Sequence, residues 1–545
     1  RKPIKTQYTK LNIDTGYSRL YIGDIQVTCR IRQEGMNRGT IQMARRTKLI
    51  VDKDFRIGEV DKRIYGSFIE HLGRAVYTGI YQPGHPTADE LGFRKDVIDL
   101  VRELDVPIVR YPGGNFVSNF YWEDSVGPKE QRKPRLDLAW RTYEPNEVGI
   151  NEFSKWAKKA NTSVMMAVNL GTRGTTDALN LLEYCNLDTN SYYANLRRQH
   201  GDQDPYGIKL WCMGNEMDGP WQMGHKEALE YGHLAAETSK AMKTMDHSIE
   251  TVVCGSSYVA MPTFGKWEAT VLDEAYDYVD YVSLHQYWGN RDHDTAEFFA
   301  ATDDLEYFLK SVIATCDYVK ATKHGKKNIN LSFDEWNVWY HSTEQDNEDM
   351  ENMPWRSHPH LLEDIYNYED AIVDALALIK FLQHADRVKI ACLAQLVNVI
   401  APIMTEENGP AWRQTIFYPF YLVSKYGRGV ALQPVMSGDD HATSKHDHVT
   451  DVEAVSVYNE EKEQVAVFAV NRNTEENVEF DVDLRGFEGY KVVDFQAMEG
   501  TDMKAVNSAA GEAVKPAARS DYRLDGGIFT ANLKPASFAV IVLGK

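Results

Sequence analysis

The chain has few cysteines and no long apolar segment. Its six cysteines stand singly among 545 residues, without a Cys-x-x-Cys pair, and several lie in apolar stretches such as TVVCGSS and KIACLAQL. Such positions are typical of free buried thiols, which indicates a reducing compartment. The longest apolar run, IACLAQLVNVIAPIM, is too short and too polar to span a bilayer, and the basic N-terminus has no apolar signal segment. These absences predict a cytoplasmic protein.

Positive charge is outnumbered by negative charge, with 60 Lys and Arg against 80 Asp and Glu. The formal net charge is −20 at pH 7, which argues against nucleic acids and anionic membranes as partners. Aromatic side chains, by contrast, are plentiful, with 30 tyrosines, 20 phenylalanines and 11 tryptophans. Such rings fill cores, and they also stack on the C–H faces of sugars. The composition therefore favours a neutral or small substrate.

Length and local composition divide the chain into parts. A chain of 545 residues is too long for one compact core, so two domains are expected. Residues 1–42 carry eight Lys and Arg against three Asp and Glu, and they show no helical or strand period. We interpret them as a leader or a non-native extension that ends before Met43.

Short apolar runs alternate with amphipathic segments over residues 58–414. Eight runs have strand character, at 63–70, 107–113, 163–171, 208–216, 250–257, 281–288, 329–336 and 389–396. Helical patterns lie between many of them, at 89–106, 151–160, 225–245 and 363–386. This alternation predicts βα units on a parallel sheet, and eight such units close a (β/α)8 TIM barrel. An open doubly wound sheet is disfavoured because no glycine-rich dinucleotide fingerprint opens any helix.

From residue 415 onwards the pattern changes to strands without helices. Runs at 452–459, 463–473, 478–484, 490–498 and 537–545 alternate in pairs, which predicts an antiparallel β-sandwich over 415–545. Residues 43–57 contain TKLIVDKDF, a strand that we expect to join this sandwich. The loop DDHATSKHDH at 439–448 holds three histidines and three aspartates. These could bind a metal, but a solvated polar loop is the preferred interpretation.

Polar side chains stand at the carboxyl ends of nearly all the predicted barrel strands. In a barrel these ends meet at one face, where active sites lie. No phosphate loop, GxSxG nucleophile motif or HExxH zinc motif competes for the site. The sequence therefore predicts a cavity suited to a hydroxyl-rich ligand. The residues concerned are Glu70, His71, Arg110, Asn115, Asn169, Asn215, Glu216, His285, Gln286, Tyr287, Glu335, Gln395 and Asn398.

Two glutamates at these ends suggest a pair of catalytic carboxyl groups. Glu216, in WCMGNEMDGPW, follows the fourth strand among tryptophans and methionines. Such apolar neighbours favour the neutral acid that a proton donor needs. Glu335, in LSFDEWNVWY, follows the seventh strand, where we expect Arg110 and Tyr287 to stabilise the charged carboxylate that a nucleophile needs. Such a pair at a barrel mouth is typical of glycoside hydrolysis.

Two neighbouring aspartates are weaker candidates. Asp334 precedes Glu335 directly, so the alternation of a strand turns it to the other face, where we expect it to support the site. Asp218 lies beyond the end of the fourth strand and is a weaker candidate than Glu216.

Seven segments resemble the α-L-arabinofuranosidases of glycoside hydrolase family fifty-one. In chain order they are IYGSFIEHLGRAVY, RYPGGNF, AVNLGTRG, WCMGNEMDGPW, SLHQYWGNRD, LSFDEWNVWY and ACLAQLVNVIAPI. The resemblance runs from about Lys48 to the C-terminus and leaves out residues 1–42. It implies a (β/α)8 barrel with a C-terminal jelly-roll-like sandwich and release of terminal α-L-arabinofuranosyl groups with retention of configuration. It also implies that no metal or organic cofactor is needed, and that a homohexamer forms.

The resemblance also implies roles for single residues. Glu216 of Gly-Asn-Glu is implied to be the acid/base, and Glu335 of Asp-Glu-Trp the nucleophile. The implied arabinofuranose subsite contains Glu70, Asn115, Asn215, Tyr287 and Gln395, with Trp339 and Trp140 on the leaving-group side and Arg110 and His285 in support. We expect Asn215 to hold the 2-hydroxyl group, and Trp336 to help Trp339 to enclose the sugar. The implied partners are arabino-oligosaccharides, arabinan or arabinoxylan fragments.

Three alternatives stay open at this point. A retaining barrel glycosidase of the endo-glucanase or xylosidase type would use the same two glutamates. A non-catalytic carbohydrate-binding protein would be expected to lose one of them, and both are present. A metal-dependent barrel hydrolase could use His71, His285 and Glu335 as ligands.

Overall fold

The computed structural model describes residues 18–22, 25–29 and 45–545. Residues 1–44 and residues 45–545 form separate units. In the first unit β1 (Ser18–Ile22) pairs antiparallel with β2 (Ile25–Cys29), although the sequence predicted no element there. The rest of the predicted extension lies outside the described residues. Within the described residues, no helix is long and apolar enough to cross a membrane.

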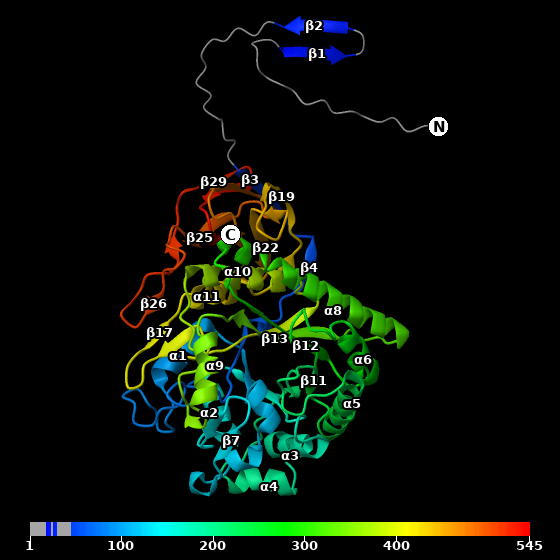
Figure 1. Ribbon diagram of the computed structural model, residues 1–545, viewed down its shortest axis with the longest axis vertical. Helices are drawn as coiled ribbons and strands as arrows, with labels where there is room; N and C mark the ends of the chain where they lie inside the picture. Colours follow the sequence, from blue (N-terminus) through cyan, green and yellow to red (C-terminus); the bar gives the residue numbers. More distant parts are fainter. Residues whose placement is uncertain (1–17, 23–24, 30–44) are drawn as a thin grey trace. The chain divides into compact units, whose positions relative to one another are not determined.

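The second unit contains a closed barrel of eight parallel strands (Figure 1). Neighbouring strands around the barrel follow one another along the chain, and the last pairs with the first. The predicted TIM barrel is therefore confirmed. The barrel strands are β5 (Gly66–Phe68), β6 (Ile108–Tyr111), β9 (Ser163–Ala167), β10 (Leu210–Met213), β11 (Glu250–Cys254), β12 (Tyr281–Trp288), β13 (Asn330–Val338) and β15 (Val388–Leu393).

At least one helix follows each barrel strand. The predicted amphipathic segments at 89–106, 151–160, 225–245 and 363–386 each contain one of these helices. In chain order the helices are α1 (Lys95–Leu104), α2 (Ile150–Ala160), α3 (Thr175–Asn186), α4 (Tyr192–Gln199), α5 (Ala228–Met245), α6 (Lys266–Ala275), α7 (Thr295–Ala300), α8 (Asp303–Thr322), α9 (Thr343–Asn352), α10 (Tyr368–Gln383) and α11 (Phe417–Tyr426).

Helix α10 connects the barrel with the sandwich. It contacts β13 and β15 on one side and β22 (Val452–Asn459) and β23 (Gln464–Asn471) on the other, so almost all of its side chains are buried. The helix begins after Asn367, whose side chain accepts the backbone N–H of Asp370 at 3.2 Å. The hydroxyl group of Tyr368 donates to the carbonyl oxygens of Met498 (2.8 Å) and Ala536 (2.7 Å) in the sandwich. These contacts make the two domains one packed unit.

The sandwich consists of two sheets. The N-terminal segment contributes a strand to each of them, β3 (Arg45–Asp52) and β4 (Arg56–Glu59). One pair, β3 with β24 (Val478–Arg485), is parallel, which departs from the purely antiparallel prediction. The seven-stranded sheet has the order β28 (Ala517–Ala518), β25 (Lys491–Met498), β31 (Ser537–Gly544), β23, β22, β18 (Val430–Leu432), β4; the five-stranded sheet has the order β19 (Val435–Gly438), β3, β24, β30 (Ile528–Leu533), β29 (Tyr522–Asp525).

Short elements make up the remainder. They are β7 (Arg135–Asp137), β8 (Thr142–Glu144), β14 (Arg356–Ser357), β16 (Ile403–Thr405), β17 (Ala411–Arg413), β20 (Asp440–His441), β21 (Val449–Thr450), β26 (Asn507–Ser508), β27 (Gly511–Glu512) and four 3-10 turns at 62–65, 115–119, 122–125 and 129–131. The predicted domain boundaries at residues 42, 57 and 414 stay predictions. The predicted free thiols are found at Cys185, Cys212, Cys254, Cys316 and Cys392, which are all buried and unpaired.

Candidate active site

A cavity of about 590 Å³ opens at the carboxyl ends of the barrel strands. Nine residues predicted from the sequence line it: Glu70, Asn115, Trp140, Glu216, Gln286, Tyr287, Glu335, Trp339 and Gln395. Arg110, Asn215 and His285 lie behind this lining and bond to it. The other lining residues are Leu72, Ala139, Trp221, Met223, Ser257, Tyr258, Trp288, Gly289, Arg291, Leu362 and Ile400.

Glu335 has a hydrogen-bond donor on each carboxylate oxygen. Arg110 donates from Nη1 to Oε2 at 2.9 Å, and the hydroxyl group of Tyr287 donates to Oε1 at 2.7 Å. Arg110 is almost wholly buried, and its ion pair with Glu335 is therefore little screened by water. The arrangement fixes the orientation of the carboxylate and stabilises a negative charge on it. The predicted partners of Glu335 are the ones observed.

The surroundings of Glu216 are more polar than the sequence suggested. Its Oε2 accepts the indole N–H of Trp221 at 2.6 Å, and its Oε1 lies 2.9 Å from Nδ1 of His285. Trp221 thus offers the carboxyl group of Glu216 a hydrogen-bond donor, and not only an apolar ring. The backbone of Glu216 has a φ of 44°, a left-handed conformation that costs free energy for this residue type and is common at functional sites.

His285 joins the two glutamates. Its Nδ1 also lies 3.6 Å from Oε2 of Glu335, and its Nε2 lies 3.1 Å from Oδ1 of Asp334. Burial by itself lowers the pKa of His285, but the charge of Glu335 and the hydrogen bonds with Asp334 and Glu216 outweigh it and raise the pKa to about 10. At neutral pH the imidazole ring is therefore protonated on both nitrogens and positively charged.

Asp334 supports the site from behind, as expected. Its carboxylate accepts the hydroxyl groups of Ser283 (2.5 Å) and Ser332 (3.0 Å) in addition to its contact with His285. Burial alone would raise the pKa of Asp334, but the charge of Arg110 and the bond from His285 hold it below its ordinary value. Asp334 is thus the counter-charge of the protonated His285 ring.

The same group of side chains is the candidate metal site. One ligand atom each from Glu216, His285 and Glu335 lies within 4.8 Å of the other two, and this is the one group of three such residues found in the described part of the chain. The protonated His285 has no free lone pair for a metal ion, since both of its ring nitrogens face carboxylates. A metal ion at this group would therefore have to displace a proton from His285.

Glu70 lies on the other side of the cavity as a third buried carboxyl group. Its Oε1 accepts the Phe116 backbone N–H (2.8 Å) and the Trp140 indole N–H (3.0 Å), and its Oε2 accepts Nε2 of Gln395 (3.2 Å). Burial raises the pKa of Glu70 to about 8 despite the hydrogen bonds from Trp140 and Phe116, and the charge of Glu335 adds to this. Glu70 is therefore mainly neutral at pH 7.

An amide network lies behind the cavity. Asn215 accepts Nη2 of Arg110 at 2.6 Å, and it donates to Oδ1 of Asn115 (3.1 Å) and Oε1 of Gln222 (3.2 Å). Both amide hydrogens of Asn215 are thus used within the protein, and Asn115 is the member that lines the cavity. Arg110 connects this network to Glu335.

Three of the residues predicted near the barrel mouth, His71, Asn398 and Trp336, lie away from the large cavity, whereas Asp218 lies beside it next to the lining residue Ser257. His71 does not approach the two glutamates, because its ring nitrogens bond to Glu144 and to the Tyr111 hydroxyl group. Asn398 bonds to the Arg74 carbonyl oxygen and to Thr405. Trp336 is fully buried and packs against Phe381 with ring centroids 5.3 Å apart, so the prediction that it encloses the sugar is wrong. Asp218 accepts the backbone N–H of Ser257 at 3.1 Å.

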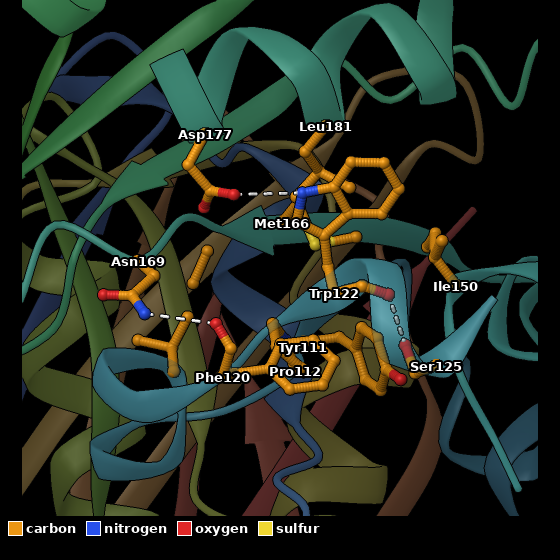
Figure 2. A pocket seen from close by; sticks show the side chains of 12 residues that line it. Tyr111, Pro112, Phe120, Trp122, Ser125, Ile150, Met166, Asn169, Asp177 and Leu181 are labelled. Carbon is orange, nitrogen blue, oxygen red and sulfur yellow. Dashed lines mark hydrogen bonds between the residues drawn. The ribbon is translucent and has the colours of Figure 1, made fainter. Parts of the chain in front are cut away.

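Asn169 faces a second cavity, of about 10 Å³, which lies among core side chains. Figure 2 shows its amide group turned toward the carbonyl oxygen of Phe120, to which it donates at 3.1 Å. Trp122 and Asp177 bond on the opposite side of the same cavity, with 3.2 Å between Nε1 and Oδ1. Asn169 therefore stabilises a loop and does not contribute to the large cavity.

The histidine-rich loop at 439–448 contains paired side chains. His441 bonds to Asp451 (2.7 Å), His448 to Asp440 (3.0 Å), and His446 lies 3.2 Å from Glu297 on α7. These pairs agree with the preferred interpretation of a polar loop, which here also contacts the barrel.

Several residues of the cavity were not predicted from the sequence as parts of the site. Trp221, Tyr258, Trp288 and Arg291 lie in the loops after β10, β11 and β12 or at the last position of β12. Loop residues have no regular period that relates position to direction. The sequence offered a signal for two of these residues: Trp288 directly follows Tyr287 on β12, and Trp221 stands five residues beyond Glu216. Gln222, which supports the amide network, was missed for the same reason.

Comparison with known proteins assigns the family. Residues 100–306 match the pattern of the α-L-arabinofuranosidase 1 domain, and residues 334–537 match that of the α-L-arabinofuranosidase C-terminal domain. The chain is 62% identical over 502 residues to an intracellular exo-α-(1→5)-L-arabinofuranosidase of Acetivibrio thermocellus, covering 92% of this chain and all of that protein. It is 45% identical over 507 residues to an exo-α-(1→6)-L-arabinofuranosidase of Bifidobacterium longum, covering 91% of this chain and 97% of that protein.

Solved structures agree with this assignment. The structure of a family 51 α-L-arabinofuranosidase of Bifidobacterium longum superposes with a TM-score of 0.87 at 44% identity, covering 92% of this chain and 99% of that one. Sequence similarity of this extent, together with the same barrel and sandwich, leaves one assignment. The chain belongs to the α-L-arabinofuranosidase family of glycoside hydrolases.

Proposed function

We propose that the protein is a retaining, exo-acting enzyme that releases terminal α-L-arabinofuranosyl residues from arabino-oligosaccharides, arabinan or arabinoxylan fragments. The observation that carries this proposal is the pair of carboxyl groups at the barrel mouth. Glu216 and Glu335 approach each other with oxygens within 4.8 Å. Carboxyl groups about 5–5.5 Å apart are typical of retaining glycosidases, whereas inverting enzymes keep them about 6.5–9.5 Å apart to admit a water molecule.

In the first step Glu335 attacks the anomeric carbon while Glu216 protonates the departing oxygen. The bond between the anomeric carbon and that oxygen breaks, and a glycosyl ester of Glu335 forms. The donors Arg110 and Tyr287 orient the attacking carboxylate. Trp221 and His285 orient the carboxyl group of Glu216. The leaving group departs as a neutral alcohol.

In the second step the roles reverse. Esterification has removed the negative charge of Glu335, and Glu216 now lacks its proton, so it can act as a base. Glu216 takes a proton from a water molecule, which attacks the anomeric carbon and releases the carboxylate of Glu335. Two displacements at one carbon give retention, and Glu216 gives one proton to the leaving alcohol and regains one from the attacking water. No step requires an oxidant, a reductant or a bound cofactor.

The remaining cavity residues would hold the sugar. We assign Glu70, Asn115, Tyr287 and Gln395 to the arabinofuranose subsite because they line the cavity around Glu335. Trp339, whose ring lies edge-on to that of Tyr287 with centroids 5.3 Å apart, and Trp140 would form the walls on the leaving-group side. Asn215 would act on the 2-hydroxyl group through Asn115, which lines the cavity and accepts a hydrogen bond from Asn215; a hydrogen bond to this hydroxyl group that strengthens in the transition state lowers the barrier.

The names of the relatives support a preferred linkage and a location, and they say nothing of the assembly. The 62% identity to an enzyme named for the α-(1→5) linkage favours this linkage over α-(1→6), the linkage named for the relative at 45%. The word intracellular in the first of these names supports a cytoplasmic enzyme that acts on imported oligosaccharides in hemicellulose breakdown. A homohexamer remains the prediction for the assembly.

The direct test is the release of nitrophenol from 4-nitrophenyl α-L-arabinofuranoside. We expect fast release from this compound and far slower release from 4-nitrophenyl β-D-xyloside and β-D-glucoside, because the similar proteins are named α-L-arabinofuranosidases. Preference for either of the other glycosides would favour another retaining barrel glycosidase. Binding of arabinose without release from any of the three would favour a carbohydrate-binding protein.

Removal of metal ions is expected to leave the activity unchanged. The protonated ring of His285 is a poor ligand, and the two-step reaction moves only protons and carbon–oxygen bonds. The measurement is kcat/KM after exhaustive dialysis against a strong chelator, compared with the same sample after addition of Zn²⁺, Mn²⁺ or Mg²⁺. A loss of activity that one of these ions restores would support the metal-dependent alternative.

A further inference from the structure

Another cavity lies at the end of the barrel opposite to Glu216 and Glu335. Its volume is about 310 Å³, and its lining includes residues at or just before the starts of four neighbouring strands, β5, β6, β9 and β10. The last turns of α2 contribute to the same lining. Because the reaction described above takes place at the carboxyl ends of the strands, this cavity has no part in it.

All the charged side chains that line this cavity are positive. They are Lys62, Arg63, Lys158 and Lys209, and none of the described residues in the lining is an aspartate or a glutamate. In the whole chain, by contrast, acids outnumber bases by 80 to 60. Arg63 is neutralised by ion pairs with Asp61 (2.8 Å) and Glu250 (2.6 Å). The three lysines therefore give the cavity a positive potential on an acidic protein.

Two of these lysines have ammonium groups that are free to bind a ligand. Lys209 donates to the hydroxyl group of Ser248 at 2.5 Å. Lys62 and Lys158 are exposed, and their ammonium groups form no ion pair or hydrogen bond within the part of the chain that the structure describes. An anion in the cavity can therefore bind to both without breaking an existing contact.

The lining between the cations is mainly apolar. Ile108, Val164, Ile208 and Leu210 lie at or near the starts of their strands, are almost fully buried, and line the cavity. The hydroxyl group of Ser163 adds a polar group beside them. Sites for small organic molecules typically combine a mostly apolar lining with a few polar or charged groups that fix the orientation. The lining thus suits a ligand that has a carbon body as well as a negative charge.

The backbone around the cavity leaves room for a ligand. Gly207 lines the cavity with a φ of 69°, and a Cβ atom at this position would meet nothing within 4 Å. The carbonyl oxygens at the end of α2 would repel an anion. Those of Ala157 and Lys158, however, accept the backbone N–H groups of Thr162 (2.9 Å) and Asn161 (3.3 Å), which reduces this repulsion.

We propose that this cavity, which we call the lysine cavity, is a second binding site that takes a small organic phosphate monoester. The two free ammonium groups of Lys62 and Lys158 match the double negative charge of the phosphate group, to which lysine binds as a point charge. The apolar lining receives the organic part of the ligand. The proposal is independent of the proposed function, and the lysine cavity has no catalytic role.

The test is isothermal titration of the full-length protein with phenyl phosphate at low ionic strength. We expect saturable binding of one molecule per chain. Inorganic phosphate should bind about tenfold more weakly, because it lacks the apolar ring. Succinate should also bind more weakly, and benzyl alcohol, which carries no charge, should not bind. Added salt should weaken the binding of phenyl phosphate, because free surface charges are screened.

Variants of the two lysines locate the bound molecule. We expect Lys62→Gln and Lys158→Gln each to lower the affinity for phenyl phosphate about tenfold, since each removes one charged hydrogen-bond donor. Lys158→Arg should retain most of the affinity because it keeps the charge. Lys326→Gln is the matched control, because Lys326 is exposed, does not line the cavity and has no ion-pair partner among the described residues. All these variants should release nitrophenol from 4-nitrophenyl α-L-arabinofuranoside at the wild-type rate, which checks that they are folded.

The outcomes are distinguishable. The absence of saturable binding of phenyl phosphate to the wild-type protein would overturn the site. Equal affinity in the wild type and in the variant that carries both lysine-to-glutamine changes would place the molecule elsewhere and overturn it as well. Inorganic phosphate that binds as tightly as phenyl phosphate would overturn the assignment of an organic ligand, and tighter binding of succinate would overturn the assignment of a phosphate group. None of these results bears on the arabinofuranosidase activity, which nitrophenol release measures separately.

Discussion

Replacement of Glu335 by alanine is expected to lower kcat on 4-nitrophenyl α-L-arabinofuranoside by roughly 10⁴-fold or more, as is usual for the loss of a covalent nucleophile. The physical reason is that no other carboxylate can reach the anomeric carbon from the same side. Glu216 is held by Trp221 and His285, and Glu70 is largely protonated at neutral pH. The variant should remain folded, because Glu335 contacts the cavity and removal of its side chain leaves space that water can fill.

The measurement is nitrophenol release by both proteins at equal concentration, with thermal unfolding as a check of the fold. Glu237→Ala, on the exposed face of α5, is the matched control for the loss of a glutamate. Azide should partly restore the variant, because it can occupy the vacated space and attack the anomeric carbon directly. A single displacement gives the β-azide. Equal rates for wild type and variant would require a different nucleophile.

Replacement of Glu216 by alanine is expected to produce a loss that depends on the leaving group. General acid catalysis contributes about 10²–10⁴-fold, so the loss on arabinobiose should lie in this range. The loss should be much smaller for the first step on the 4-nitrophenyl glycoside, since nitrophenolate departs without a proton. Breakdown of the glycosyl ester then limits the rate, because no base activates water.

The measurement is the time course of nitrophenol release, in which we expect a burst followed by slow turnover. It is combined with kcat/KM on both substrates. Azide should accelerate the slow phase by attacking the ester of Glu335, and two displacements give the α-azide. The two glutamate variants thus yield azides of opposite configuration, which separates nucleophile from acid/base without reference to rates. A Glu216→Ala loss of the same size on both substrates would argue against proton donation by this residue.

The sequence predicted the positions of site residues best where these residues lie on the barrel strands. Strands β12 and β13 carry Tyr287 and Glu335 at predicted positions, and β6 carries Arg110. Their side chains meet because eight parallel strands bring their carboxyl ends to one face. The contacts of Glu335 with Arg110 and Tyr287 were therefore predictable, although the sequence is silent about the distances.

Two residues near the strand ends were placed wrongly. Trp336 follows Glu335 directly, so the alternation of the strand, which also applies to Asp334, turns it into the core. His71 stands at a strand end like Glu70, but Glu144 of β8 binds its ring. Nothing in the local sequence distinguishes His71 from the positions that face the cavity. The partner that captures a polar side chain comes from another part of the chain.

The sequence by itself predicted the barrel and the sandwich, because periodicity is a local property, and it predicted the family through seven motif segments. It also placed Glu216 and Glu335 at strand ends that meet at one face, and their catalytic roles stay a proposal. Only the tertiary structure decided the protonation of His285 between three carboxylates, the raised pKa of Glu70 and the pairing of Trp221 with Tyr258. Each of these depends on burial and on contacts between loops far apart in the chain. Such contacts form only when the barrel closes, and for that reason they leave no regular pattern in the order of the residues.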